Sequence, residues 1–412
     1  MKKLAYVLVV VLVLLLQTGC GSDQAAPTLA PTDPPASTPT PMPSATLTKE
    51  AEPTTTLLPT ATPTPPATAT LVPTAAPPTA TEAPPDPATE IDADLTSLTQ
   101  KNAFTGSVLV ARDGEVLLSK GYGLAYRAAN LPNTPQTKFR ICSVTKQFTA
   151  MAILILQAQG LLDVQDPVCD YLSECPAAWR EIALHHLLTH TSGIPDLTEF
   201  PDYEGTKASP ATPLQLIARF RDKPLAFRPG ETWSYSNSGY ILLGYVIEQV
   251  SGQSYEAFLQ EHIFAPLQMR DSGYDHNLDI LAVGYTGEGA RWRKGDYIDM
   301  SVPYAAGALY STVEDLYRWD QALYTEQLVP QALLDRMFTP FATSSLGGFG
   351  YGWIITREQG RQVVRHGGGG DGFTSIIVRY PADRATVIVL SNRDTTDLRS
   401  IVSTIAQKLF AQ

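Results

Sequence analysis

The sequence of 412 residues has few basic residues, few cysteines and no long apolar run. Lys and Arg number 30 against 41 Asp and Glu, giving a formal net charge of −11. Such a chain lacks the basic footprint of nucleic-acid binding. Its longest apolar run, residues 4–16, is too short to span a bilayer. The four cysteines form no CxxC pair, so no metal site is expected among them, and no cofactor site is evident.

Aromatic residues are absent from residues 24–90. Pro, Thr and Ala supply 50 of these 67 residues, including 18 of the 33 prolines of the whole chain. A segment of this composition cannot bury enough apolar area to offset the entropy lost on ordering. We therefore expect a disordered linker over residues 20–90, extended by its prolines into a stalk, and one folded domain over residues 91–412.

The first 19 residues are typical of an export signal, since Lys2 and Lys3 precede the short apolar run. The end of this segment resembles the lipobox of bacterial lipoproteins, with small residues before Cys20, although Gln17 stands where an apolar residue is usual. The resemblance implies cleavage before Cys20 and its lipidation, and two acyl chains suffice for stable anchoring. We expect an extracytoplasmic protein anchored to the membrane. The alternative is an ordinary secreted protein cleaved near Gly19.

Export also permits disulfides. Cys169 and Cys175 lie close together in a stretch with the composition of a loop, and they are the candidate pair. Two unpaired buried thiols are the alternative. Cys142 would then be a lone buried thiol.

Strand patterns lie near both ends of the folded part, and helical patterns lie between them. Asp113 and Gly114 suit the tight turn of a first hairpin, and a second hairpin is expected near the C-terminus. We predict an α+β fold: one antiparallel sheet built from N-terminal and C-terminal segments and flanked by helices, with a mostly helical inserted subdomain. The expected strands are residues 107–112, 115–120, 373–380 and 384–391, and the expected helices are residues 145–159, 213–220, 240–250, 255–264, 313–323 and 396–410.

Three short motifs carry possible chemistry. Ser143 and Lys146 are three residues apart at the start of a helical pattern, which places an amine beside a hydroxyl at a helix N-terminus. Tyr235 and Asn237 form a Tyr-x-Asn motif, and His366 begins a His-Gly-Gly motif. Each motif is short enough to arise by chance. A solvated lysine, an ordinary turn and a flexible glycine hinge are the structural alternatives.

His186 and His190 are spaced like a pair of metal ligands on a helix. Leu187 stands where a zinc protease would have a glutamate, so a packed loop is the expected role of this segment and no metal is expected.

The sequence around these motifs resembles the serine β-lactamase-like hydrolases, which include class C β-lactamases, D,D-carboxypeptidases and related esterases and D-amino-acid peptidases. The resemblance extends from about Phe104 to Ser391 and rests on several segments in the order of the family. These segments are residues 139–150, 186–194, 227–230, 235–240, 307–312, 351–353 and 366–369.

The resemblance implies a role for each motif residue. Ser143 is the nucleophile, Lys146 is its base partner and Tyr235 is a second base that passes the proton to the leaving group. Asn237 holds the substrate and orients Lys146. The backbone N–H groups of Ser143 and Gly369 form the oxyanion hole.

Tyr235, His366 and Cys142 raise further expectations about the site and its substrate. Tyrosine needs a cationic neighbourhood to act as a base, which Lys146 and His366 could supply. Where class C β-lactamases have Lys-Thr-Gly, this chain has His366 followed by glycines, so a substrate carboxylate should be held less firmly. A small ester, an amide or a D-amino-acid peptide therefore fits better than a β-lactam. Cys142 is expected to pack behind Ser143.

The sequence thus predicts a membrane-tethered serine hydrolase that forms an acyl-enzyme on Ser143. Its expected partners are a small-molecule or peptide substrate, the membrane through its lipid, and cell-wall material. The alternative is a non-catalytic or sensor-type protein of the same fold that binds cell wall or β-lactams.

Overall fold

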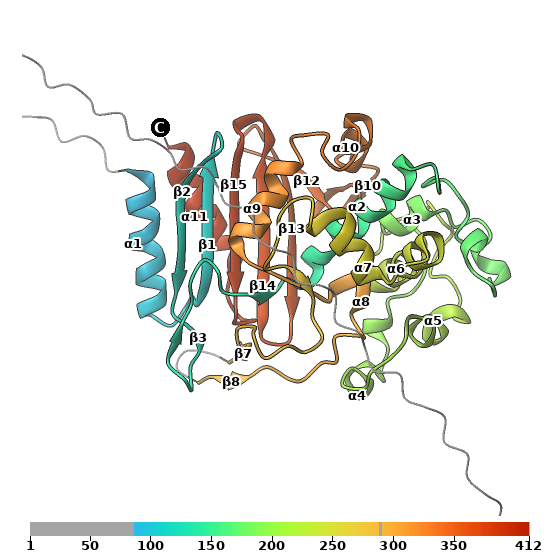
Figure 1. The fold of residues 1–412 in the computed structure, drawn as a ribbon, viewed down its shortest axis with the longest axis horizontal. Coiled ribbons are helices and arrows are strands. Elements are labelled where there is room, and N and C mark those ends of the chain that lie inside the picture. Colours follow the sequence, from blue (N-terminus) through green and yellow to red (C-terminus); the bar gives the residue numbers. More distant parts are fainter. Residues whose placement is uncertain (1–85, 288–290, 412) are drawn as a thin grey trace, which may run out of the picture. The chain divides into compact units, whose positions relative to one another are not determined.

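The computed structural model describes residues 86–287 and 291–411 (Figure 1). The predicted signal, Cys20 and almost all of the predicted linker lie outside the described residues. Helix α1 (Pro87–Gln100) begins inside the predicted linker, which was expected to end at residue 90. Asp86 caps this helix by accepting a hydrogen bond from the Ala88 amide at 3.3 Å, and a proline in the first turn is favourable because its missing N–H has no helical partner there.

An antiparallel sheet of eight strands forms the centre of the fold (Figure 1). Strand β1 (Gly106–Arg112) pairs with β2 (Glu115–Tyr122) on one side and with β15 (Ala385–Ser391) on the other, so N-terminal and C-terminal segments of the folded part share one sheet, as the sequence predicted. In spatial order the strands are β10 (Ala342–Ser344), β11 (Gly347–Phe349), β12 (Ile354–Glu358), β13 (Arg361–Gly370), β14 (Phe373–Tyr380), β15 (Ala385–Ser391), β1 (Gly106–Arg112) and β2 (Glu115–Tyr122).

Side chains alternate between the two faces of this sheet. On one face, Val108 and Val110 of β1 pack with α1 and with α11 (Leu398–Phe410). On the other face, Leu109 and Ala111 join the larger core beneath the helical part. Both faces of the central strands are therefore covered, which explains why the strands are almost continuously apolar.

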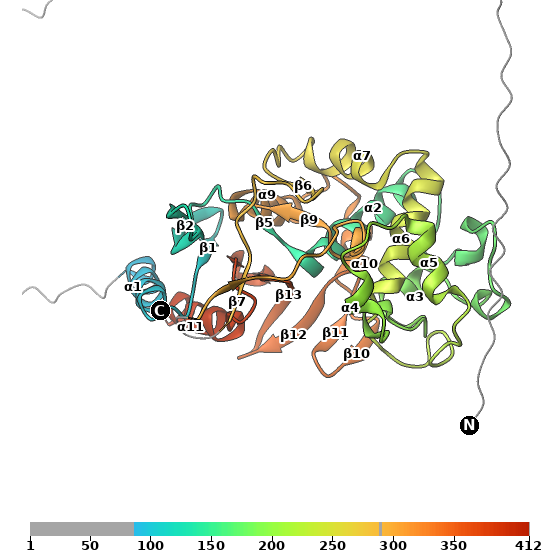
Figure 2. The ribbon, with the colours of Figure 1, turned by 90° about the horizontal axis from the view of Figure 1, so that it is seen from below.

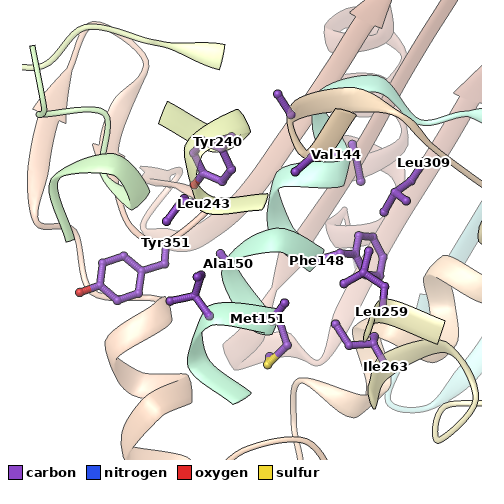
Figure 3. Close-up of a cluster of buried hydrophobic side chains, with 14 of the residues drawn as sticks. Val144, Phe148, Ala150, Met151, Tyr240, Leu243, Leu259, Ile263, Leu309 and Tyr351 are labelled. Atoms are coloured by element: carbon purple, nitrogen blue, oxygen red, sulfur yellow. The ribbon is translucent and has the colours of Figure 1, made fainter. Parts of the chain in front are cut away.

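The helical part contains α2 (Thr145–Ala158) at its centre. Twelve of its 14 residues are buried, because α6 (Asn237–Ser251) and α8 (Tyr304–Gly307) pack against it, with further contacts from α7 (Tyr255–Leu259) and α10 (Gln331–Met337). Figure 3 shows Phe148 and Met151 of α2 beside Leu259 and Ile263. The other helices are α3 (Leu184–Leu188), α4 (Tyr203–Thr206), α5 (Pro213–Arg221) and α9 (Val313–Ala322).

Figure 2 shows α3 to α7 gathered at the end of the view opposite α1 and α11. Three small sheets complete the strands of the described residues. The first contains β5 (Phe139–Arg140), β9 (Leu309–Ser311) and β6 (Gly273–Tyr274). The second pairs β3 (Leu124–Tyr126) with β4 (Leu131–Pro132), and the third pairs β7 (Tyr285–Thr286) with β8 (Arg293–Lys294). Among the described residues, no helix combines the length and the apolarity that a bilayer crossing requires.

The predicted α+β fold is confirmed, including both hairpins. Asp113 and Gly114 have φ values of 52° and 83°, the left-handed conformation that the first turn requires. The structure adds α1, β10 to β13 and an earlier start for α6, at Asn237. It also contains a disulfide between Cys169 and Cys175, whose Cα atoms are 5.2 Å apart.

Candidate active site

Ser143 lies in a single 3₁₀ turn, Cys142–Val144, that leads directly into α2. Val144 N donates to Ile141 O at 3.1 Å to close the turn, and the same carbonyl accepts from Ser375 Oγ at 2.7 Å. The nucleophile turn is therefore tied to strand β14. The helix that follows directs backbone N–H groups and the positive end of its dipole toward Ser143, which favours negative charge developing there.

Lys146 is fully buried beside Ser143. Its Nζ donates to Ser143 Oγ at 3.2 Å, to Asn237 Oδ1 at 2.8 Å and to Ala306 O at 2.8 Å. Burial lowers the pKa of Lys146 to about 7, although the negative charge of Asp196 opposes this shift. A large share of the lysine is therefore neutral near pH 7, and the neutral amine can take the proton of the Ser143 hydroxyl.

Asn237 is held in a fixed orientation at the start of α6. Its Nδ2 donates to Asp196 Oδ2 at 2.9 Å, which turns Oδ1 toward Lys146. Asp196 is only 7% exposed and also accepts from the Thr198 amide at 3.1 Å. Asp196 was not predicted from the sequence, because its contact with Asn237 joins residues that are far apart in the chain. Only the turn formed by Asp196 and Thr198 is a local signal.

We expect Asp196→Asn to move the pH midpoint of catalysis to lower pH. The asparagine can keep a hydrogen bond to Asn237, but it removes the negative charge that raises the pKa of Lys146. Less proton affinity at Lys146 means that the neutral amine persists at lower pH. The midpoint of log(kcat/KM) against pH, measured for wild type and variant, checks this result. A midpoint that moved to higher pH would contradict the assignment of this midpoint to the titration of Lys146.

Tyr235 lies against His190, with ring centroids 4.3 Å apart. His190 Nδ1 accepts a hydrogen bond from the Ser236 amide at 3.1 Å, so this histidine supports the Tyr-x-Asn turn. His186 Nδ1 likewise accepts from the Ala183 amide at 3.0 Å. Each of the two histidines that were spaced like metal ligands thus supports the backbone of a turn with one ring nitrogen.

Burial raises the pKa of Tyr235, although its contact with Ser143 opposes the shift. Tyr235 is therefore a neutral phenol in the free protein, despite Lys146 Nζ lying 4.9 Å from its ring centre. A neutral phenol can still pass a proton on, by giving its own and receiving another. The structure thus favours Lys146 as the base and Tyr235 as the relay.

The state of His366 differs from the expectation that this residue supplies positive charge. His366 is 3% exposed, and burial, with a contribution from Lys146, lowers its pKa to about 3. Its Nδ1 lies 2.7 Å from Gly367 O, so that nitrogen carries the proton of a neutral ring. The expectation that His366 supplies positive charge to Tyr235 is therefore wrong. The two rings are neighbours, with centroids 6.4 Å apart.

The glycines after His366 let strand β13 approach Ser143. Strand β12 pairs with β13 only as far as Arg365, and the rest of β13 borders the turn of Ser143. A Cβ atom on Gly368 would lie 2.3 Å from Ile141 O and 2.8 Å from Ser143 N, closer than van der Waals contact allows. Gly369 lines the cavity beside Ser143. The oxyanion site expected between the backbone N–H groups of Ser143 and Gly369 stays a prediction.

A cavity of about 470 Å³ opens beside Ser143 and Asn237. Its apolar wall includes Leu197, Ile241, Ile298, Met300 and Val302. The lining also includes five charged side chains, those of Arg140, Glu204, Lys207, Asp371 and Asp394.

Cys142 also lines this cavity, so it does not simply pack behind Ser143. Its φ of 47° is unusual for a residue with a side chain. Burial raises the pKa of the Cys142 thiol to about 12, which leaves it protonated and a poor nucleophile at neutral pH.

Comparison with known proteins agrees with this arrangement. A family model described as beta-lactamase matches residues 91–410. Penicillin-binding protein 4* of Bacillus subtilis is 32% identical over 341 residues, which cover 77% of this chain and 74% of the relative. The octameric penicillin-binding protein homologue from Pyrococcus abyssi is 31% identical, with a TM-score of 0.71 over 79% of this chain and 77% of that one.

A further similar structure is the D-stereospecific amidohydrolase from Streptomyces sp., which is 25% identical with a TM-score of 0.67, over 80% of this chain and all of that one. The family match spans the nucleophile turn, the Tyr-x-Asn turn and strand β13, and it ends within the last helix. The chain therefore belongs to the β-lactamase family and is a serine hydrolase.

Proposed function

We propose that the protein is an extracytoplasmic hydrolase that forms an acyl-enzyme on Ser143 from small D-configured amides, esters or peptides. The observation that carries the proposal is the environment of Lys146. This amine is buried, lies 3.2 Å from Ser143 Oγ and has a pKa of about 7. A general base is most effective when its pKa is near the working pH.

The reaction follows from these contacts. Ser143 Oγ attacks the substrate carbonyl carbon while its proton passes to neutral Lys146. The N–H groups of Ser143 and Gly369 stabilise the oxyanion. Tyr235 gives its proton to the leaving nitrogen or oxygen and receives one from Lys146, and the carbonyl–leaving-group bond breaks. Water then attacks the ester carbonyl, and its proton returns through Lys146 to Ser143 Oγ as the acid leaves.

The charge of the site supports substrates without a carboxylate on the leaving side. His366 is neutral, so it offers no positive charge to such a group. The two cations of the cavity wall are already paired: Arg140 Nε lies 2.7 Å from Asp275 Oδ2, and Lys207 Nζ lies 2.7 Å from Asp371 Oδ1. β-Lactams and peptides ending in D-Ala-D-Ala both carry a carboxylate. Amides and esters are therefore favoured, and the similarity to a D-stereospecific amidohydrolase supports the D configuration.

A panel of substrates tests the proposed function. We expect wild-type protein to hydrolyse D-alanine p-nitroanilide faster than its L enantiomer, and faster than nitrocefin or acetyl-D-Ala-D-Ala. Steady-state kcat/KM values for the four compounds decide this order. A faster rate with nitrocefin would overturn the substrate assignment. A covalent adduct with penicillin that formed without turnover of any compound would instead indicate a sensor.

We also propose that Cys20 carries a lipid that anchors the protein to the outer face of a membrane. The support is the sequence alone: the charged start, the short apolar run and the cysteine that follows it. Cells expressing the full chain and fed an alkyne fatty acid should yield a labelled protein in the membrane fraction. The Cys20→Ser variant serves as the control and should be unlabelled. Equal labelling of both proteins, or none of wild type, would contradict the anchor.

A further inference from the structure

Lys207 and Asp371 form an ion pair on the wall of the active-site cavity. Lys207 directly follows α4 in the helical part, and Asp371 lies in the turn between β13 and β14 of the sheet. Their Nζ and Oδ1 atoms are 2.7 Å apart, and the side chains are only 9% and 20% exposed. The pair therefore connects two separate parts of the fold across the wall of the site.

Given the acyl-enzyme proposed above, we place the pair on the acyl side of Ser143. Tyr235, which delivers a proton to the leaving group, lies beside His366 at the other end of the glycine segment of β13. The cavity continues in the opposite direction, along Gly369, Gly370 and Asp371. Strand residues advance about 3.3 Å each, and Asp371 directly follows Gly370, the last residue of β13, so Asp371 lies at most about 7 Å beyond Gly369. An extended acyl donor advances by the same amount per residue and would reach the ion pair after about two residues.

Both partners are fixed in position. Asp299 N donates to Lys207 O at 2.9 Å. The Asp371 backbone packs so closely on Gly295 that a Cβ there would lie 2.7 Å from it. Burial disfavours the charge of Lys207, but hydrogen bonds from its ammonium to Asp371 and Glu204 raise its pKa overall. Lys207 therefore stays an ammonium, and neither partner can move aside without losing contacts.

A second hollow lies beyond this wall. A groove of about 1000 Å³ is lined in part by Tyr126, Ile280 and Tyr297. Asp371 and two other residues, Arg140 and Phe373, line both this groove and the catalytic cavity. The side chains of these shared residues thus separate the two spaces, and the contact with Lys207 holds Asp371 between them.

We propose that the Lys207–Asp371 ion pair limits the length of the acyl donor, so that the enzyme accepts aminoacyl amides and esters of one or two residues and excludes longer peptides. This inference rests on the proposed acyl-enzyme at Ser143. It adds a specificity-determining pair to the proposed site and excludes the stem of a cell-wall peptide as the preferred acyl donor.

Two chromogenic substrates of different length test this proposal. The short one is D-alanine p-nitroanilide, and the long one is an acetylated tetrapeptide that ends in D-alanine p-nitroanilide. The measured quantity is the ratio of kcat/KM for the long substrate to that for the short one. It is compared among wild type, Lys207→Met and Asp371→Asn. The matched control, Lys223→Met, makes the same chemical change at an exposed lysine of the same helical part that is absent from the cavity lining.

We expect the ratio to rise about 10- to 200-fold in both Lys207→Met and Asp371→Asn, the range by which the fit of a pocket discriminates between substrates. The rise should come from a lower KM for the long substrate, and the control should keep the wild-type ratio. An unchanged ratio in both variants would overturn the length limit, whatever the absolute rates. A wild-type protein that hydrolysed neither substrate, with Ser143 unmodified, would overturn the proposed function itself.

Discussion

Replacing Ser143 by alanine is expected to lower kcat/KM for a p-nitroanilide or p-nitrophenyl ester by at least about 10⁴-fold. The reason is that no other described residue places a nucleophile of suitable reactivity at the same position. The neighbouring thiol of Cys142 has a pKa of about 12 and is protonated at neutral pH. The cavity and the backbone donors would remain in the variant, so a small residual rate over uncatalysed hydrolysis is expected.

Initial rates under subsaturating substrate measure this loss. The matched control is Ser403→Ala, the same change at an exposed serine of α11, which should keep the wild-type rate. A thermal melt of each variant shows whether the fold persists. If Ser143→Ala kept more than about a tenth of wild-type activity while folded, Ser143 would not be the nucleophile.

The second large effect concerns Lys146 and pH. Burial lowers the pKa of Lys146 to about 7, so its neutral form increases as pH rises through that value. Because only the neutral amine can take the proton of Ser143, log(kcat/KM) should rise through pH 7 and then level off. Lys146→Met keeps an unbranched side chain but has no amine. We expect it to lose about 10²- to 10⁴-fold in kcat/KM, the usual contribution of a general base.

Other titratable groups near Ser143 should not produce a rise of log(kcat/KM) near pH 7. The pKa of His366 is lowered to about 3, that of His190 lies well below the usual range, and that of Tyr235 is raised. A wild-type profile measured from pH 5 to 9 therefore tests Lys146 in particular. A profile that was flat between pH 6 and 8, or a Lys146→Met variant with the wild-type profile, would exclude Lys146 as the base.

Lys146→Met is also expected to destabilise the fold. It leaves Asn237 Oδ1 and Ala306 O without their buried donor, and each loss is of the order of 1–3 kcal/mol. Activity must therefore be compared at a temperature where the variant is folded, as judged by its own thermal melt.

The parts of the site that the sequence predicted are those encoded by local spacing. Ser143 and Lys146 are three residues apart at a helix start, so helical geometry alone places them together. Tyr235 and Asn237 share one turn at the start of α6. Sequence periodicity does not show that these two segments lie side by side in the fold. Only the resemblance to a known family implied it.

The parts that were missed depend on tertiary contacts. Asp196 orients Asn237, which contacts Lys146, and Asp196 and Asn237 are 41 residues apart in the sequence. Lys207 and Asp371, which form an ion pair, are 164 residues apart. The neutral state of His366 depends on burial that no local pattern reveals. Strands β10 and β11 were missed because each has only three residues, and β11 begins with two glycines, which are depleted in strands.

Mapping the acyl group is the most direct measurement of the central claim, that Ser143 carries the acyl-enzyme. Wild-type protein is quenched in acid during turnover of a slow p-nitrophenyl ester and digested with trypsin. Because Arg140 and Lys146 are cleavage sites, Ser143 falls in the peptide of residues 141–146 together with Cys142. Fragment ions distinguish the two residues. We expect one acyl group per chain, on Ser143, and none in Ser143→Ala. An acyl group on Cys142, or turnover with Ser143 unmodified, would contradict it.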